Sequence, residues 1–166
     1  YRRFGMATAL LLVSSRAAFA IDDGFHAAKV QLKRTRSGIE TMKFFGKGGA
    51  LPTPGTMNDP ATGSPGGVLI ELFSASHPGG ATFVVPQGSG IPGWITATGS
   101  RAVFKFLNSD APNTFSDVKR ANLRVGSSVS VLARRTGLPL GIPLGSVGIR
   151  ITIGTIRDCA FFTGTS

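Results

Sequence analysis

The only tryptophan of the chain has a setting in which it could take part in binding chemistry. Trp94 lies beside a glycine in the stretch IPGWITATG, and the basic residues Arg101 and Lys105 follow it. An exposed indole with cations nearby suits an acidic sugar, because the ring supplies a stacking platform and the cations attract carboxylate or sulfate groups. Aromatic rings serve packing first, so the other role that we expect of Trp94 is a hydrophobic anchor at the edge of the core.

The other reactive side chains are few and far apart in the sequence. His26 and His77 are the only histidines, and Cys159 is the only cysteine. A catalytic thiol needs a neighbouring base, and a zinc site needs three or four His, Cys or acidic ligands at suitable spacing. No local pattern ties either histidine to Cys159, so we predict no catalytic residue, no metal site and no cofactor. A lone cysteine in an exported protein suggests a disulfide between two chains or a buried thiol that acts as a small apolar residue, and Phe161 and Phe162 beside Cys159 favour burial.

Two further patterns bear on catalysis. The stretch GSGIPG at 88–93 has the form GxGxxG, but Pro92 and the residues after it do not begin the helix that would hold a pyrophosphate. The eight carboxylates are scattered, and no pair of them is marked for acid–base work. Distant carboxylates can still converge in a fold, so a small hydrolase with a site assembled from distant residues stays an alternative.

The elements that would position these side chains are short strands. In SVGIRITI, at 146–153, β-branched residues alternate with small or polar residues, which indicates a half-buried strand. We predict a second core strand after a turn at 154–155, extending to residue 162. The same alternation predicts strands at 28–34, 38–45, 68–74, 81–86, 101–107 and 128–134, while 117–125 fits either a strand or a helix.

Glycine and proline divide the chain into these short elements. The 166 residues include 23 Gly and 10 Pro, and the pattern predicts an all-β chain, a single-domain antiparallel β-sandwich or jelly-roll-like fold. We expect HPGG at 77–80 to be a turn. The long Gly/Pro-rich loop at 46–67 is expected to be disordered or a plain connection. We expect the stretch at 136–146, with three leucines and one isoleucine, to cap the end of the core.

The first 20 residues have the pattern of a secretory signal peptide. An Arg-Arg pair at 2–3 precedes an apolar run at 6–13, and Ala-Phe-Ala at 18–20 fits the pattern that signal peptidase cleaves. The apolar run is far below the ~20 residues of a spanning helix, so we predict no transmembrane segment. The predicted organisation is a signal peptide at 1–20 and a β-sandwich domain at 21–166, in a protein that is secreted or periplasmic.

The chain is strongly basic, with 18 Lys and Arg, 8 Asp and Glu, and a net charge of +10. This excess favours attraction to polyanions, for example an acidic glycan or an envelope surface. The cations cluster only at 33–36, 119–120 and 134–135, without the interleaved aromatic residues that stack on bases, which argues against nucleic acid. A solvated surface that happens to be cationic is the alternative.

Short motifs are spread over residues 29–162. They are KVQLK at 29–33, VLIELFS at 68–74, PQGSGIPGW at 86–94, RAVFKFL at 101–107 and RDCAFF at 157–162. In these motifs the chain resembles a group of uncharacterised secreted proteins from deltaproteobacteria and related environmental bacteria, although Asp158 stands where that group usually has Tyr. The resemblance implies export and a β-rich fold, and it implies no reaction.

Together these observations predict a secreted, non-catalytic structural or adhesive β-module. The first alternative is a carbohydrate-binding module for acidic glycans, with Trp94, Arg101 and Lys105 as binding residues. A binding module of this kind requires Trp94 to be exposed in a groove with basic neighbours, whereas a structural role requires Trp94 to be buried. A hydrolase requires two carboxylates, or a histidine and an acid, to meet in a cleft.

Overall fold

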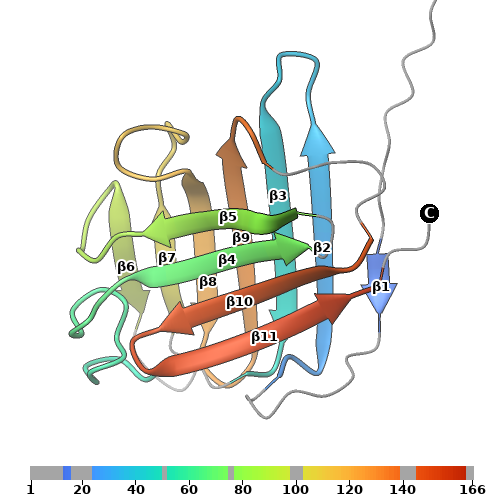
Figure 1. Cartoon of the computed structure of the whole chain (residues 1–166). Helices are drawn as coiled ribbons and strands as arrows, with labels where there is room; N and C mark the ends of the chain where they lie inside the picture. Colours follow the sequence, from blue (N-terminus) through green and yellow to red (C-terminus); the bar gives the residue numbers. More distant parts are fainter. Residues whose placement is uncertain are drawn as a thin grey trace, which may run out of the picture.

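Two antiparallel β-sheets make up the part of the chain that the structure describes. The computed structural model describes residues 13–15, 24–49, 52–74, 77–97, 103–138 and 145–163. Within these ranges every regular element is a strand, and the strands of one sheet run across those of the other (Figure 1). Face-to-face packing of two sheets defines a β-sandwich, so the predicted fold class is confirmed.

The larger sheet has seven strands and the smaller sheet has four. In spatial order the larger sheet contains β1 (Val13–Ser15), β2 (Ala27–Arg34), β3 (Glu40–Lys47), β9 (Ser128–Arg135), β8 (Val118–Arg124), β7 (Val103–Leu107) and β6 (Gly93–Ala97). The smaller sheet contains β11 (Ile156–Phe162), β10 (Val147–Ile153), β4 (Val68–Ser74) and β5 (His77–Val85).

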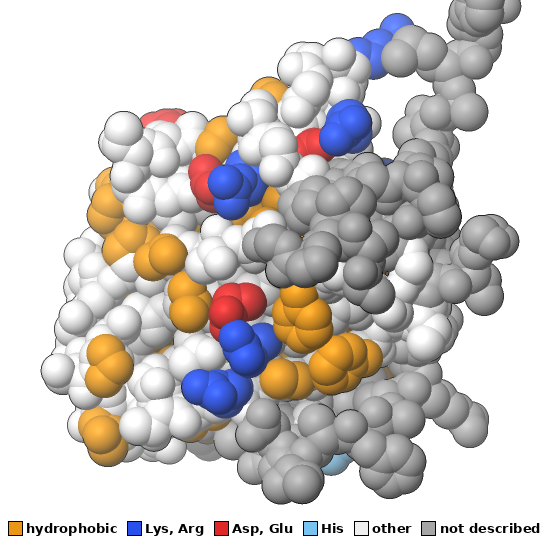
Figure 2. Space-filling view, viewed as in Figure 1, with side chains coloured by type: hydrophobic (Ala, Val, Ile, Leu, Met, Phe, Trp, Pro, Cys, Tyr) orange, Lys and Arg blue, Asp and Glu red, His pale blue; other side chains and the backbone are white. Residues whose placement is uncertain are grey.

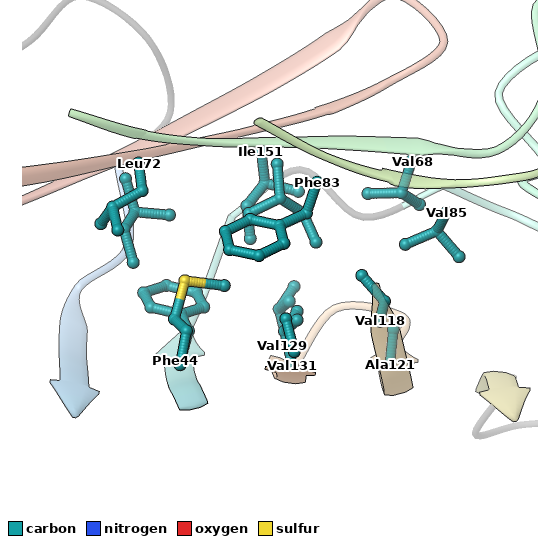
Figure 3. Packing of buried hydrophobic residues seen from close by; sticks show 14 of the residues in the cluster. Phe44, Val68, Leu72, Phe83, Val85, Val118, Ala121, Val129, Val131 and Ile151 are labelled. Atoms are coloured by element: carbon teal, nitrogen blue, oxygen red, sulfur yellow. The ribbon is translucent and has the colours of Figure 1, made fainter. Parts of the chain in front are cut away.

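The core lies between the two sheets because each strand turns alternate side chains inward. In β10 the inward residues Val147, Ile149, Ile151 and Ile153 are all buried, and the turn before β11 falls at 154–155, as the alternation predicts. Removing such side chains from water is the main source of stability in a fold of this kind. Figure 3 shows side chains of the two sheets meeting, with Leu72, Phe83 and Ile151 on one side and Phe44, Val129, Val131 and Val118 on the other.

The observed strands differ from the predicted ones in three places. HPGG at 77–80 is not a turn but the beginning of β5, because the ladder between β4 and β5 continues past a register shift to a pairing of Ser74 with His77. Gly80 accommodates the irregularity with a φ of 52°, a conformation that favours glycine. The stretch 117–125, for which a helix was an alternative, contains strand β8. Strand β6 was not predicted.

The Gly/Pro-rich loop begins two residues later than expected and is folded where it is described. Gly46 and Lys47 continue β3 and pair with Val129 and Ser128, so the loop starts at residue 48. Over 52–67 the chain forms successive turns around Asp59, whose carboxylate accepts backbone N–H bonds from Gly55, Ala61 and Thr62 at 2.9, 2.7 and 3.2 Å. Of the two expected possibilities, disorder or a plain connection, the structure shows an ordered connection over 52–67.

The hydrogen bonds around Asp59 also fix its ionisation. Burial of the carboxylate raises the pKa, but the hydrogen bonds from Gly55, Ala61 and Thr62 outweigh burial and bring the pKa below its ordinary value of 3.8. The Asp59 side chain therefore carries a negative charge at neutral pH, and that charge holds the turns together.

The N-terminal region is described only in part. Of the predicted signal peptide, Val13–Ser15 forms β1, which pairs with Ala28–Val30 of β2, and the other residues lie outside the described ranges. Across the described ranges, none of the secondary structure is a helix of the length and hydropathy needed to cross a bilayer. Within 136–146, Leu138 is buried against the core, as the capping role predicts, and 139–144 lie outside the description.

Candidate functional site

Trp94 is part of the core and is not a binding platform. The indole is only 1% exposed, its Nε1–H donates to the carbonyl oxygen of Pro86 at 2.8 Å, and its ring centroid lies 5.4 Å from that of Phe106. The backbone before it forms a tight irregular loop, in which Trp94 N–H bonds Gly88 O at 2.8 Å, and a strand rather than a helix follows. A sugar ring cannot stack on this indole, so the predicted platform at Trp94 is wrong and its role as a hydrophobic anchor is confirmed.

Of the two cations expected beside Trp94, the described one, Lys105, does not form a site with it. Lys105 lies between the inward residues Phe104 and Phe106, so alternation places it on the outer face of β7 and on the opposite side of the sheet from Trp94. Arg101 lies outside the described residues. The residue that pairs with Lys105 across the ladder is Ile95, whose side chain also faces outward.

Basic residues are spread along the whole length of the outer face of the seven-stranded sheet. Because antiparallel registers align side chains in rows across a sheet, the outward positions of β2, β3, β9, β8 and β7 form four successive rows. Each row contains two cations. They are Lys47 and Arg124 in the first row, Lys29 and Lys105 in the second, Lys43 and Arg120 in the third, and Lys33 and Arg134 in the fourth.

The seven described strands place no carboxylate on this face to balance these charges. The only acidic residue in the seven strands is Glu40, which is 1% exposed and points inward at the start of β3. It accepts hydrogen bonds from Arg34 Nε at 2.7 Å and from the backbone N–H of Leu138. Among the described residues, none of the eight cations in the four rows forms an ion pair. We call this surface the basic face.

A hollow of about 580 Å³ lies in the basic face between the first two rows. Phe45 of β3 forms one side, and this residue is 41% exposed although most of the described Phe residues are buried. Lys47 and Arg124 stand at the end of the hollow, in the row next to Phe45. Its other lining residues are small and polar: Asn122, Ser127, Ser128 and Ser130, with Asn122 Nδ2 3.2 Å from Ser130 Oγ. We call this hollow the Phe45 groove.

Sequence reasoning missed the Phe45 groove because its residues come from three strands that are distant in the chain. Phe45 and Asn122 meet only because both pair with Ser130. A signal was present in the period-two positions: KFFGK at 43–47 and RANLR at 120–124 each place cations two residues to either side of the central residue. Charge clusters counted along the chain hide this pattern, because neighbouring residues of a strand lie on opposite faces.

The outer face of the smaller sheet has a different character. Arg150 and Glu71 form a bidentate pair at 2.6 and 2.7 Å, which lowers the pKa of Glu71 mainly through the Arg150 hydrogen bonds. Phe73 and Phe161 pack edge to face with their centroids 5.6 Å apart. Figure 2 shows this face, where acidic and basic side chains touch and hydrophobic side chains gather beside them. The charges here are partly paired, unlike those of the basic face.

Cys159 lies on this same outer face and not in the core. The inward residues of β11 include Asp158 and Ala160, so alternation turns Cys159 outward, where it is half-buried. The neighbouring Phe161 and Phe162 favoured full burial of the thiol, and the structure buries Cys159 only in part. Among the described residues, no group of three His, Cys, Asp or Glu side chains gathers in a way that would hold a metal ion.

The comparisons with known proteins give no relative from which a site can be transferred. The chain matches no family model, no curated protein and no solved structure. The resemblance to secreted deltaproteobacterial proteins stays a prediction, and the functional argument rests on the basic face and its groove.

Proposed function

We propose that the protein is a secreted, non-catalytic adhesive β-module that attaches to polyanionic surfaces through its basic face. The observation that carries this proposal is the placement of Lys and Arg in all four rows of one sheet face, with Glu40 buried on the opposite side of that sheet. Export is supported by the signal-peptide pattern at 1–20.

The spacing of the cations suits an extended polymer or surface better than a small ligand. Neighbouring strands lie ~4.8 Å apart and alternate residues of a strand ~7 Å apart, so the four rows span about 20 Å along the strands. One weak contact at a solvated surface contributes ~1 kcal/mol or less, and many contacts made together are needed for firm attachment. A flat array of cations provides such contacts only to a partner that presents many anionic groups.

Four carboxylates that the structure describes have structural partners, which favours a non-catalytic role. Glu40 is bonded to Arg34, and Glu71 to Arg150. In the loops, Asp59 is bonded to three backbone N–H groups, and Asp117 lies 3.7 Å from Arg135. These side chains hold structure together and do not converge on a cleft as a hydrolase would require.

The test compares two charge-reversal variants that have the same net charge. The full chain is eluted from a sulfonated resin by a salt gradient and compared with a double variant of the basic face that carries Lys43→Glu and Arg120→Glu. The matched control reverses Arg36, in the β2–β3 turn, and Arg157, on the outer face of β11. We expect the basic-face variant to elute at clearly lower salt than the control, because two central contacts become repulsions, a loss of at least about 1.4 kcal/mol or tenfold in affinity.

Equal elution of the two variants would show that the resin responds to net charge and not to the basic face, and this would overturn the proposal. Far-UV circular dichroism of both variants checks that each keeps the β-fold, so that a shift in elution reports binding and not unfolding.

A further inference from the structure

The Phe45 groove has the features of a saccharide subsite. We propose that one sugar ring of an acidic polysaccharide lies on Phe45, with its carboxylate or sulfate group directed to Lys47 and Arg124. This inference rests on the proposed function, because it names the class of polyanion that the basic face holds. It replaces Trp94 as the aromatic platform with a residue that the fold leaves exposed.

Phe45 is the one aromatic side chain that the seven strands of the larger sheet direct outward. Phe44, Trp94, Phe104 and Phe106 all point into the core, where each is at most 2% exposed. The exposed ring of Phe45 on an otherwise polar, charged face is not needed to fill the core, because its neighbour Phe44 is the residue that β3 buries there. An exposed aromatic ring beside cations is suited to the apolar face of a sugar.

The polar residues of the groove complement sugar hydroxyl groups. Ser128, Ser130 and Asn122 line its floor along two rows, and all three are half-buried. Hydroxyl and carboxamide groups both donate and accept hydrogen bonds, as sugar hydroxyls do. A smooth array of Lys and Arg alone would attract any polyanion, whereas short polar side chains between cations provide specificity for a polyhydroxylated one.

The cations are arranged on both sides of the Phe45 ring. Lys47 and Arg124 lie one row away in one direction, and Lys43 and Arg120 lie one row away in the other. Both pairs connect β3 with β8 across β9, so the two members of a pair are ~10 Å apart, and the two pairs are about 13 Å apart along the strands. A polymer of acidic sugars that crosses the groove therefore meets cations before and after the ring that stacks on Phe45.

Nucleic acid fits the same surface less well. Proteins that bind single strands stack successive bases on several aromatic residues along a basic groove. The basic face offers Phe45 alone, and its other apolar outward residues, such as Ile95, are aliphatic. A flat anionic membrane would contact the cations without using the groove. The observations favour a polymer that needs one aromatic contact and several hydrogen bonds for each bound unit.

The experiment measures binding of the full chain to three polyanions at one ionic strength. Polygalacturonate has acidic sugar rings, polyglutamate has carboxylates without sugar rings, and single-stranded poly(dT) has phosphates and bases. The test variant is Phe45→Leu, which keeps the charge and removes the ring, and Phe45→Trp restores a ring. The control is Ile95→Ala on the same face, where the side chain is 42% exposed and lies outside the groove.

We expect Phe45→Leu to weaken polygalacturonate binding about three- to tenfold and polyglutamate binding less than about twofold, because only the sugar ring stacks. Phe45→Trp should restore polygalacturonate binding, and Ile95→Ala should bind like the unchanged chain. Amide shifts induced by digalacturonate in β3, β8 and β9 would locate the site independently.

Other outcomes overturn the inference in distinguishable ways. If both carboxylate polymers bind and Phe45→Leu changes neither, the groove is not a sugar site, although the adhesive function of the basic face stands. If poly(dT) binds most tightly and depends on Phe45, the ligand class is nucleic acid and the saccharide assignment is wrong. If none of the three polyanions binds, the proposed function itself fails.

Discussion

Replacing Trp94 tests whether this residue acts through packing alone. The buried indole donates one hydrogen bond, to Pro86 O at 2.8 Å, and packs on Phe106. Trp94→Phe removes the hydrogen bond, worth about 1 kcal/mol, and leaves part of the indole volume empty, which costs about 1 kcal/mol more. We therefore expect a loss of about 2 kcal/mol for Trp94→Phe and of about 3–5 kcal/mol for Trp94→Ala.

The assay is urea unfolding followed by far-UV circular dichroism, because the variants lack the tryptophan whose fluorescence would otherwise report the transition. Domains of this kind have total stabilities of ~5–15 kcal/mol, so Trp94→Phe should remain folded with a lower midpoint and an unchanged slope. Polygalacturonate binding by the folded Trp94→Phe variant should equal that of the unchanged chain.

A different pattern of results would refute the reasoning. If Trp94→Phe were as stable as the unchanged chain and bound polygalacturonate more weakly, the indole would have to be accessible to ligand. The buried position of Trp94 and the assignment of the aromatic contact to Phe45 would then both be wrong. A matched exposed variant, Phe45→Leu, should give the opposite pair of results, with little change in stability and weaker binding.

Three further predictions concern the loop and the smaller sheet. The pKa of Asp59 is lower in the native state than its unfolded value of about 3.8. Its contribution to stability is therefore fully present above the unfolded pKa and is lost as the pH falls through the native pKa. Asp59→Asn should remove this pH dependence and flatten the acid limb of a curve of stability against pH. Asp59→Ala at pH 7 should lower the free energy of unfolding by roughly 2–3 kcal/mol, because three backbone N–H groups lose their acceptor, and an unchanged urea midpoint would contradict this. Gly148→Ala should lower the free energy of unfolding by about 1–2 kcal/mol, because the new Cβ would lie 2.1 Å from the Phe73 ring. Thr152→Ala on the same strand is the control. In a chain that also carries Phe73→Leu, the effect of Gly148→Ala should be smaller.

The positions of the strands could be predicted from the sequence because alternation is a local property. The stretch VLIELFS at 68–74 coincides with β4, and the segment 146–162 contains β10 and β11 with the turn between them. Strand β6 escaped prediction because GWITA has no alternation of apolar and polar residues, and the strand forms by pairing with β7. Its place in the sheet depends on tertiary pairing, which local pattern does not encode.

The candidate site could not be predicted because it depends on register. Phe44 and Phe45 are adjacent residues of the same type, but Phe44 is buried in the core and Phe45 lines the groove. A shift of one residue in the pairing of β3 with β9 would exchange them. The same shift would separate Lys47 from Arg124, which share a row only through Ser128. The global charge predicted a polyanionic partner, but the register decides which cations stand together.

If the basic face attaches to an anionic surface as proposed, the two-layered fold determines which face of the molecule points away from that surface. Because the sheets are opposite walls of a single core, a molecule held down by its cationic wall turns the Phe73–Phe161 pair and the Glu71–Arg150 pair toward the medium. Under the proposed function, every copy bound in this way would have the same orientation. A film of such copies would replace an anionic exterior with one that has fewer uncompensated charges and more aromatic surface, which changes what the coated object can adhere to next.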